Sequence, residues 1–139
     1  MLIFSKEILV LSWSSFDQSG EKWVKVGIII QTEPCGYQDF GTAYQAAIAA
    51  LEKGHEVQVF LFDESVIAAQ KNVKMVGERQ VNKMVRELTE RKVRIVTCGA
   101  CCMFRGITSD MLVDGAEMGG LTDLAKIIQW ADRILNLGH

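Results

Sequence analysis

Hydrophobic positions that alternate with polar ones, or run unbroken over a few residues, predict β-strands in this chain. The first such segment alternates and then becomes wholly apolar, which is typical of a strand covered on both faces of a sheet. The second places Val57, Val59 and Leu61 at every other position, and the third is a short β-branched run. The predicted strands cover residues 23–31, 56–62, 93–96, 115–119 and 132–137.

Apolar residues recur every three or four positions in other segments, which predicts amphipathic helices over residues 42–53, 79–91 and 121–131. The first is rich in alanine and is followed by Gly54, a typical helix stop. Shorter helical turns are expected at residues 66–70 and, with Ser109 as the N-cap, at residues 110–113. Because strands alternate with helices, the pattern predicts an α/β fold with a mainly parallel sheet covered on both faces.

Length and composition indicate one domain with a substantial core. The chain has 139 residues, of which 49% are hydrophobic, and the domain pattern covers residues 23–139. Residues 1–22 form an N-terminal extension that patterning does not define. It is compatible with an edge strand, an oligomer contact, a disordered leader or a start site placed too early.

Charge and cysteine usage exclude several classes of protein. The net charge is -2 and basic residues are interspersed with acidic ones, so no basic face predicts nucleic-acid binding. No run of about 18 apolar residues predicts a membrane span, and the first residues lack the cationic start of a signal peptide. Three of the four cysteines lie within five residues, whereas a secreted disulfide framework spaces its cysteines along the chain. We therefore expect a cytoplasmic protein.

Cys98 is the main candidate for chemistry, because it ends the third predicted strand and is followed at once by Gly99 and Ala100. The carboxyl ends of parallel strands line the ligand crevice of open α/β sheets. Amides at the start of the next helix favour a thiolate there. Such a thiolate could accept sulfane sulfur or attack a disulfide; alternatively, Cys98 is a small buried hydrophobic residue.

Other residues near this turn are candidate helpers. Cys101 completes a C-x-x-C pair with Cys98, which is also typical of dithiol redox sites. Cys35 follows the first strand and is expected on the same edge of the sheet, whereas Cys102 is expected in the core. Arg105 is the cation beside the turn, suited to steady a thiolate or an anionic sulfur species, unless it is an ordinary solvated arginine.

Metal and cofactor sites are not predicted. Adjacent cysteines at 101 and 102 do not readily ligate one metal ion, and His55 and His139 lie apart from them in the sequence. The glycines at 36 and 41 match neither a dinucleotide-binding fingerprint nor a P-loop.

The order of these features resembles the DsrE/DsrF-like family, which includes the TusD-type sulfur-relay subunits. The resemblance runs from about residue 24 to residue 137 and leaves residues 1–22 uncovered. It rests on an apolar first strand with a Pro34 loop, an alanine-rich helix ending Lys53-Gly54-His55, the strand 56–62, Cys98 with a small-residue turn to Arg105-Gly106, and a closing Gly120-Leu121 helix followed by Asp132-Arg133-Ile134.

The resemblance implies a single-domain, three-layer α/β/α fold with a five-stranded, flavodoxin-like parallel sheet, assembled into trimers or hexamers. Cys98 matches the cysteine that carries persulfide sulfur between protein partners in the active members. Cys101 and Cys102 depart from the TusD-type pattern, which has small alanine-like residues there. A second thiol could resolve a persulfide as a disulfide.

The main hypothesis is a cytoplasmic sulfur carrier or sulfurtransferase that loads Cys98, with donor and acceptor proteins as partners. Cys101 and Cys35 are auxiliary thiols, while Gly99, Ala100 and Arg105 stabilise the thiolate. One alternative is an oligomeric binding or regulatory module whose cysteines are structural or redox-sensing. Another is a dithiol oxidoreductase that uses Cys98 and Cys101, so enzymatic activity stays open at this point.

Overall fold

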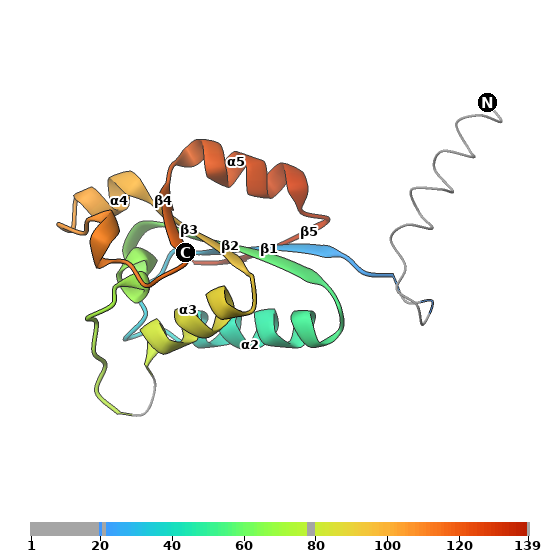
Figure 1. Ribbon diagram of the computed structural model, residues 1–139, viewed down its shortest axis with the longest axis horizontal. Helices are drawn as coiled ribbons and strands as arrows, with labels where there is room; N and C mark the ends of the chain where they lie inside the picture. Colours follow the sequence, from blue (N-terminus) through green and yellow to red (C-terminus); the bar gives the residue numbers. More distant parts are fainter. Residues whose placement is uncertain (1–19, 21, 78–79, 139) are drawn as a thin grey trace.

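The computed structural model describes residues 20, 22–77 and 80–138 of the chain. In sequence order the elements are β1 (Lys25–Ile30), α2 (Asp39–Glu52), β2 (Glu56–Leu61), the 3-10 helix η1 (Asp63–Ala69), α3 (Val81–Glu90), β3 (Arg94–Cys98), α4 (Gly99–Met103), the 3-10 helix η2 (Ser109–Met111), β4 (Ala116–Gly119), α5 (Leu121–Trp130) and β5 (Arg133–Leu137). Helices α2 and α3 cover one face of the sheet and α5 covers the other, while α4 lies at one end (Figure 1). This layering confirms the predicted α/β/α class.

The sheet has five strands in the order β4-β3-β2-β1-β5, and every neighbouring pair is parallel. Strand β1 thus lies between β2 and β5, whereas in the flavodoxin order the first strand lies between the second and the third. Because all strands run the same way, their carboxyl ends share one edge. The loops after β1, β2 and β3, which carry the candidate cysteines, therefore leave from that same edge.

The core lies on both faces of the three inner strands, as their continuous apolar sequences predict. Phe60 of β2 is fully buried at the centre, and its ring centroid lies 6.3 Å from that of Phe62. Small residues let α2 pack closely, with Ala43 and Ala47 buried. Helix α3 buries Val81, Val85 and Leu88, and α5 buries Ile127. Full burial of each such valine, leucine or isoleucine contributes about 1.5 to 3 kcal/mol.

Two local predictions differ from the structure. Helix α2 begins at Asp39, before the predicted residue 42, and the Asp39 carboxylate accepts a hydrogen bond from Thr32 Oγ1 at 2.7 Å. The helix predicted over residues 110–113 with a Ser109 cap is wrong, because the chain forms only the 3-10 turn η2 there. Leu112 then forms an antiparallel bridge with Gln70, and this tertiary pairing keeps the segment extended. The interpretations of residues 1–19 and 21 lie outside the described residues.

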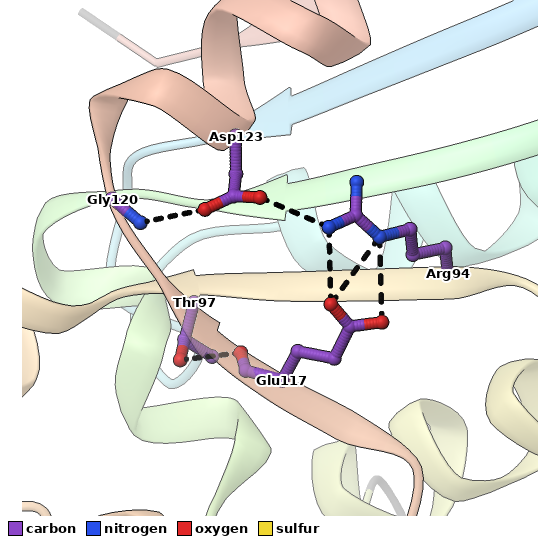
Figure 2. A network of polar contacts seen from close by, with 5 residues as sticks. All are labelled: Arg94, Thr97, Glu117, Gly120 and Asp123. Atoms are coloured by element: carbon purple, nitrogen blue, oxygen red, sulfur yellow. Dashed lines mark hydrogen bonds and ion pairs between the residues drawn. The ribbon is translucent and has the colours of Figure 1, made fainter.

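A polar network centred on Arg94 ties three elements together, as Figure 2 shows. The Arg94 guanidinium bonds both carboxylate oxygens of Glu117 on β4, and its Nη2 lies 3.0 Å from Asp123 Oδ1 on α5. Asp123 Oδ2 accepts the amide of Gly120 at 3.1 Å, and Thr97 Oγ1 donates to the Glu117 carbonyl. These contacts hold edge strand β4 and the start of α5 against β3. Hydrogen bonding to Glu117 raises the pKa of Arg94.

Stability is expected to depend on pH through Asp123. The Gly120 amide, followed by the Arg94 guanidinium, lowers the pKa of Asp123 below its ordinary value of 3.8. A lowered folded-state pKa means that the carboxylate stabilises the fold above the ordinary value and that this contribution disappears as the pH falls through the folded pKa. Asp123→Asn should therefore lower the free energy of unfolding at pH 7, with the difference from wild type shrinking as the pH falls below 3.8 towards the lowered folded-state pKa. Urea unfolding of both proteins from pH 7 downwards measures this, and a difference that stays constant would contradict it.

Candidate functional site

Cys98 stands where β3 ends and α4 begins. Its backbone is still extended (φ -65°, ψ 114°) while the next residue is helical, so Cys98 is the N-cap of α4. The Cys98 Sγ atom accepts a hydrogen bond from the amide of Cys101, three residues later, at 3.4 Å. This N-cap-to-N3 contact is the one that a serine or aspartate cap usually makes. The C-x-x-C spacing therefore places both thiols on the first turn of α4.

Cys98 is also buried, with 4% of its surface exposed, and it packs among the core residues. Its burial is what we expect of a small core residue, and the hydrogen bond that it accepts is what we expect of a reactive thiolate. Each interpretation of the sequence therefore matches one property of Cys98. Helix α4 has only five residues, so its dipole is small and the individual N–H donors matter more. Among the described residues, the amide that bonds Cys98 is that of Cys101; the thiolate-stabilising roles of Gly99 and Ala100 stay predictions.

The Cys101 thiol is held in its protonated form. Burial raises the pKa of Cys101 to about 11, and a hydrogen bond to the Cys98 side chain adds to the rise. The Asp63 amide, which donates to Cys101 Sγ at 3.3 Å, and the Arg105 guanidinium lower the pKa but do not reverse this effect. Cys101 therefore keeps its proton at neutral pH. The Cys98 sulfur accepts its hydrogen bond from the Cys101 amide.

Two side chains, Asp63 and Arg105, bond to the cysteine turn. Asp63 begins η1, just beyond the end of β2. It has a positive φ of 54°, a conformation that an aspartate tolerates better than most residues. Its carboxylate oxygen Oδ1 accepts from Arg105 Nη2 at 2.9 Å, and Arg105 Nη1 donates to the carbonyl of Cys101 at 3.0 Å. The described contacts of Arg105 are therefore with Asp63 and the backbone of α4, and its thiolate-stabilising role stays a prediction.

The other two cysteines lie in contrasting environments. Cys102 is fully buried, in agreement with its predicted core position. Burial raises the pKa of its thiol, and the Thr97 side chain has a smaller, lowering effect on that pKa. Cys35 is exposed in the loop after β1, and its amide donates to Glu33 Oε2 at 2.7 Å. The same carboxylate accepts the amide of Gly36. An auxiliary role for Cys35 stays a prediction.

Gly99 allows α4 to approach β4 closely. A Cβ atom at Gly99 would lie 2.8 Å from the carbonyl oxygen of Gly119, a backbone atom that does not move alone. At Gly120 the backbone is extended and a Cβ would meet nothing within 4 Å. The absence of a side chain at residue 99 is therefore a packing requirement of the cysteine turn.

Alanine substitutions at the two glycines test this requirement. Gly99→Ala is expected to lower the free energy of unfolding by about 1 to 3 kcal/mol, because α4 and β4 must separate. Gly120→Ala, the matched control, should cost less than about 1 kcal/mol, since only a helix-cap preference changes. Urea unfolding of both variants measures the difference, and a loss at Gly120 equal to or above that at Gly99 would contradict the close approach.

Several apolar side chains near the two thiols in the sequence are exposed to solvent. Met103 is 75% exposed and Phe104 is 90% exposed, at the end of α4, and Met111 of η2 is also exposed. Two surface hollows lie elsewhere, one around Gln38 and Gln45 on α2 and one around Lys71 before α3. Exposed apolar residues at the end of α4 are therefore a feature of the surface beside Cys98 and Cys101.

Within residues 20, 22–77 and 80–138, no group of three or more His, Cys, Asp or Glu side chains is placed to hold a metal ion. His55 Nδ1 instead accepts the amide of Val24 at 3.3 Å. In the same residues, no helix is long and apolar enough to cross a membrane.

The chain is similar to known proteins in both sequence and structure. The model of the DsrE/DsrF-like family matches residues 24–137. Protein YchN of Escherichia coli is 29% identical over 113 residues, covering 80% of this chain and 97% of YchN. A protein of Vibrio vulnificus named sulfurtransferase TusD homolog is 31% identical over 122 residues, covering 78% of this chain and 93% of the relative. The crystal structure of E. coli YchN superposes with a TM-score of 0.77 and 28% identity, covering 82% of this chain and 99% of that structure.

Proposed function

This chain belongs to the DsrE/DsrF-like family, and we propose that it is a sulfur carrier that holds sulfane sulfur as a persulfide on Cys98 and passes it to a partner protein. The observation that carries the proposal is that Cys98 is the N-cap of α4 at the carboxyl end of β3, where its sulfur accepts the amide of Cys101 at 3.4 Å. The carboxyl ends of parallel strands are where open α/β sheets place their ligands. Similarity to a protein named as a sulfurtransferase supports the same chemistry.

Loading in this proposal transfers one sulfur atom and no net electrons. The Cys98 thiolate attacks the outer sulfur of a donor persulfide, a new S–S bond forms on Cys98, and the donor's S–S bond breaks. The donor thiolate leaves with the bonding electron pair. Unloading is the same exchange onto an acceptor thiolate, so the step calls for no cofactor.

The partners in this proposal are donor and acceptor proteins that meet the carboxyl edge of the sheet in the cytoplasm. Exposed Met103 and Phe104 lie in the chain directly after the C-x-x-C turn, where such a protein has to approach. Apolar residues at the centre of a contact and polar residues around it are typical of protein interfaces. We further propose a homo-oligomer, a trimer or hexamer, as the family resemblance implies.

The burial of Cys98 favours one competing function, a binding or regulatory module with structural or redox-sensing cysteines. The two functions differ in a single measurement, the mass of the intact protein after brief incubation with inorganic polysulfide. A carrier gains about 32 mass units per sulfur atom, and peptide mapping after alkylation should place the first atom on Cys98. Transfer of that atom to an added thiol protein completes the test. A protein that gains no sulfur, or gains it only on exposed Cys35, would support the module instead.

A further inference from the structure

We propose that Cys101 discharges a persulfide on Cys98 as hydrogen sulfide, by closing a disulfide between the two residues. The proposal rests on the proposed function for the supply of the persulfide, and it adds a second activity, the reduction of sulfane sulfur to sulfide. Three features of the site carry it: the contact of the Cys101 amide with the Cys98 sulfur, the partial exposure of Cys101 and the way Asp63 and Arg105 hold the turn.

The two thiols belong to one turn at the start of α4. Cys98 is the N-cap and Cys101 the third helical residue, and the Cys101 amide bonds Cys98 Sγ at 3.4 Å. Residues three positions apart on a helix lie on one face, so the two side chains are neighbours. Cys101 is half-buried whereas Cys98 is buried, so sulfide formed between them has a short way to solvent. Disulfide closure here asks for side-chain rotation and little change of the backbone.

The chemical step balances without an external oxidant. The Cys101 thiolate attacks the inner sulfur of the Cys98 persulfide, a bond forms between the two cysteine sulfurs, and the bond to the outer sulfur breaks. The outer sulfur leaves as HS⁻ with the electron pair, so sulfane sulfur is reduced while the two thiols are oxidised. The proton that Cys101 loses goes to solvent or to the departing sulfide. A dithiol reductant then restores both thiols.

Groups that face Cys101 set the speed of this step. They are Cys98, the Asp63 amide at the start of η1, and Arg105, which bonds the Cys101 carbonyl. Burial keeps the Cys101 thiol protonated at neutral pH, so discharge is slow and a persulfide lasts long enough to reach a partner. Only the thiolate attacks, and its fraction rises about tenfold per pH unit below the pKa.

Cys102 is the competing thiol, and its surroundings argue against it. It is fully buried, and burial raises the pKa of its thiol. As the residue after Cys101 on a helix, it points in a different direction. Cys101 is the one of the two that the Asp63 amide contacts from the exposed edge of the sheet.

The test loads wild type, Cys101→Ser, Cys101→Ala and Cys102→Ala with inorganic polysulfide, removes the excess, and follows released sulfide and intact mass at pH 7, 8 and 9. Circular dichroism checks that each variant is folded. Wild type and Cys102→Ala should release one sulfide per persulfide and end two mass units below the reduced protein, faster at each higher pH. Both Cys101 variants should keep the added sulfur at least about tenfold longer.

Each other outcome has a defined meaning. If the persulfide forms on Cys98 but the Cys101 variants lose it as fast as wild type, the discharge step is wrong and the carrier function stands. Loss of release in Cys102→Ala alone would assign the step to Cys102 and overturn the proposal. If no variant and no wild-type protein takes up sulfur on Cys98, both the carrier function and the discharge fall together.

Discussion

Replacing Cys98 with serine is expected to lower the rate of sulfur uptake from polysulfide by more than about a hundredfold, because a hydroxyl is a far weaker nucleophile than a thiolate at neutral pH. The change should leave the fold intact, since serine accepts the N-cap hydrogen bond from the Cys101 amide that cysteine accepts now. Uptake is measured as the initial rate of mass gain, and urea unfolding confirms that the variant is folded.

Cys35→Ser is the control, because it shows whether sulfur uptake depends on Cys98 in particular or falls when another cysteine is removed. Cys35 is exposed and its described amide contact is with Glu33, away from the hydrogen bonds that reach Cys98. Uptake on Cys98 in the Cys35→Ser protein would assign the nucleophile to Cys98, whereas a loss there would give Cys35 the auxiliary role that its position in the sequence predicts. Uptake by Cys98→Ser at the wild-type rate would remove the carrier function.

Replacing Phe60 with alanine is expected to have the largest effect on stability, a loss of about 3 to 5 kcal/mol in the free energy of unfolding. Phe60 is fully buried on β2, the middle strand of the five, so its removal leaves a cavity in the core. A domain of this size then unfolds at a temperature lower by more than about 10 °C.

Phe104→Ala is the matched control, because it removes the same side chain from a site that is 90% exposed. Its free energy of unfolding should change by less than about 0.5 kcal/mol. Thermal and urea unfolding of the two variants give the comparison directly. Similar losses at Phe60 and Phe104 would mean that the packing around β2 is not the main source of stability.

Local patterns were sufficient to predict most of the elements. Alternation in β2 and the apolar periodicity of α3 and α5 are properties of neighbouring residues, so the strand over 56–62 and the helices over 79–91 and 121–131 could be recognised before any contact was known. Prediction was wrong at residues 110–113, where pairing of Leu112 with Gln70, far away in the sequence, overrode a local helix signal.

Local patterns also predicted part of the candidate site. A cysteine at the end of a β-branched run, followed three residues later by a second cysteine, is a local pattern, and it predicted the strand end, the turn and both thiols of the C-x-x-C pair. The sequence could also place Arg105 near the turn, because it follows within one more helical turn.

The sequence by itself determined the elements, the α/β class and the position of the thiol pair, because each depends on residues a few positions apart. Only the tertiary structure decided which strands are neighbours and what surrounds the sulfurs. Asp63 is 38 residues from Cys101 and 42 from Arg105, yet its amide meets the Cys101 sulfur and its carboxylate meets the Arg105 guanidinium. That meeting follows from the pairing of β2 with β3 in one parallel sheet, which brings the ends of both strands to the same edge, and no pattern within either segment specifies it.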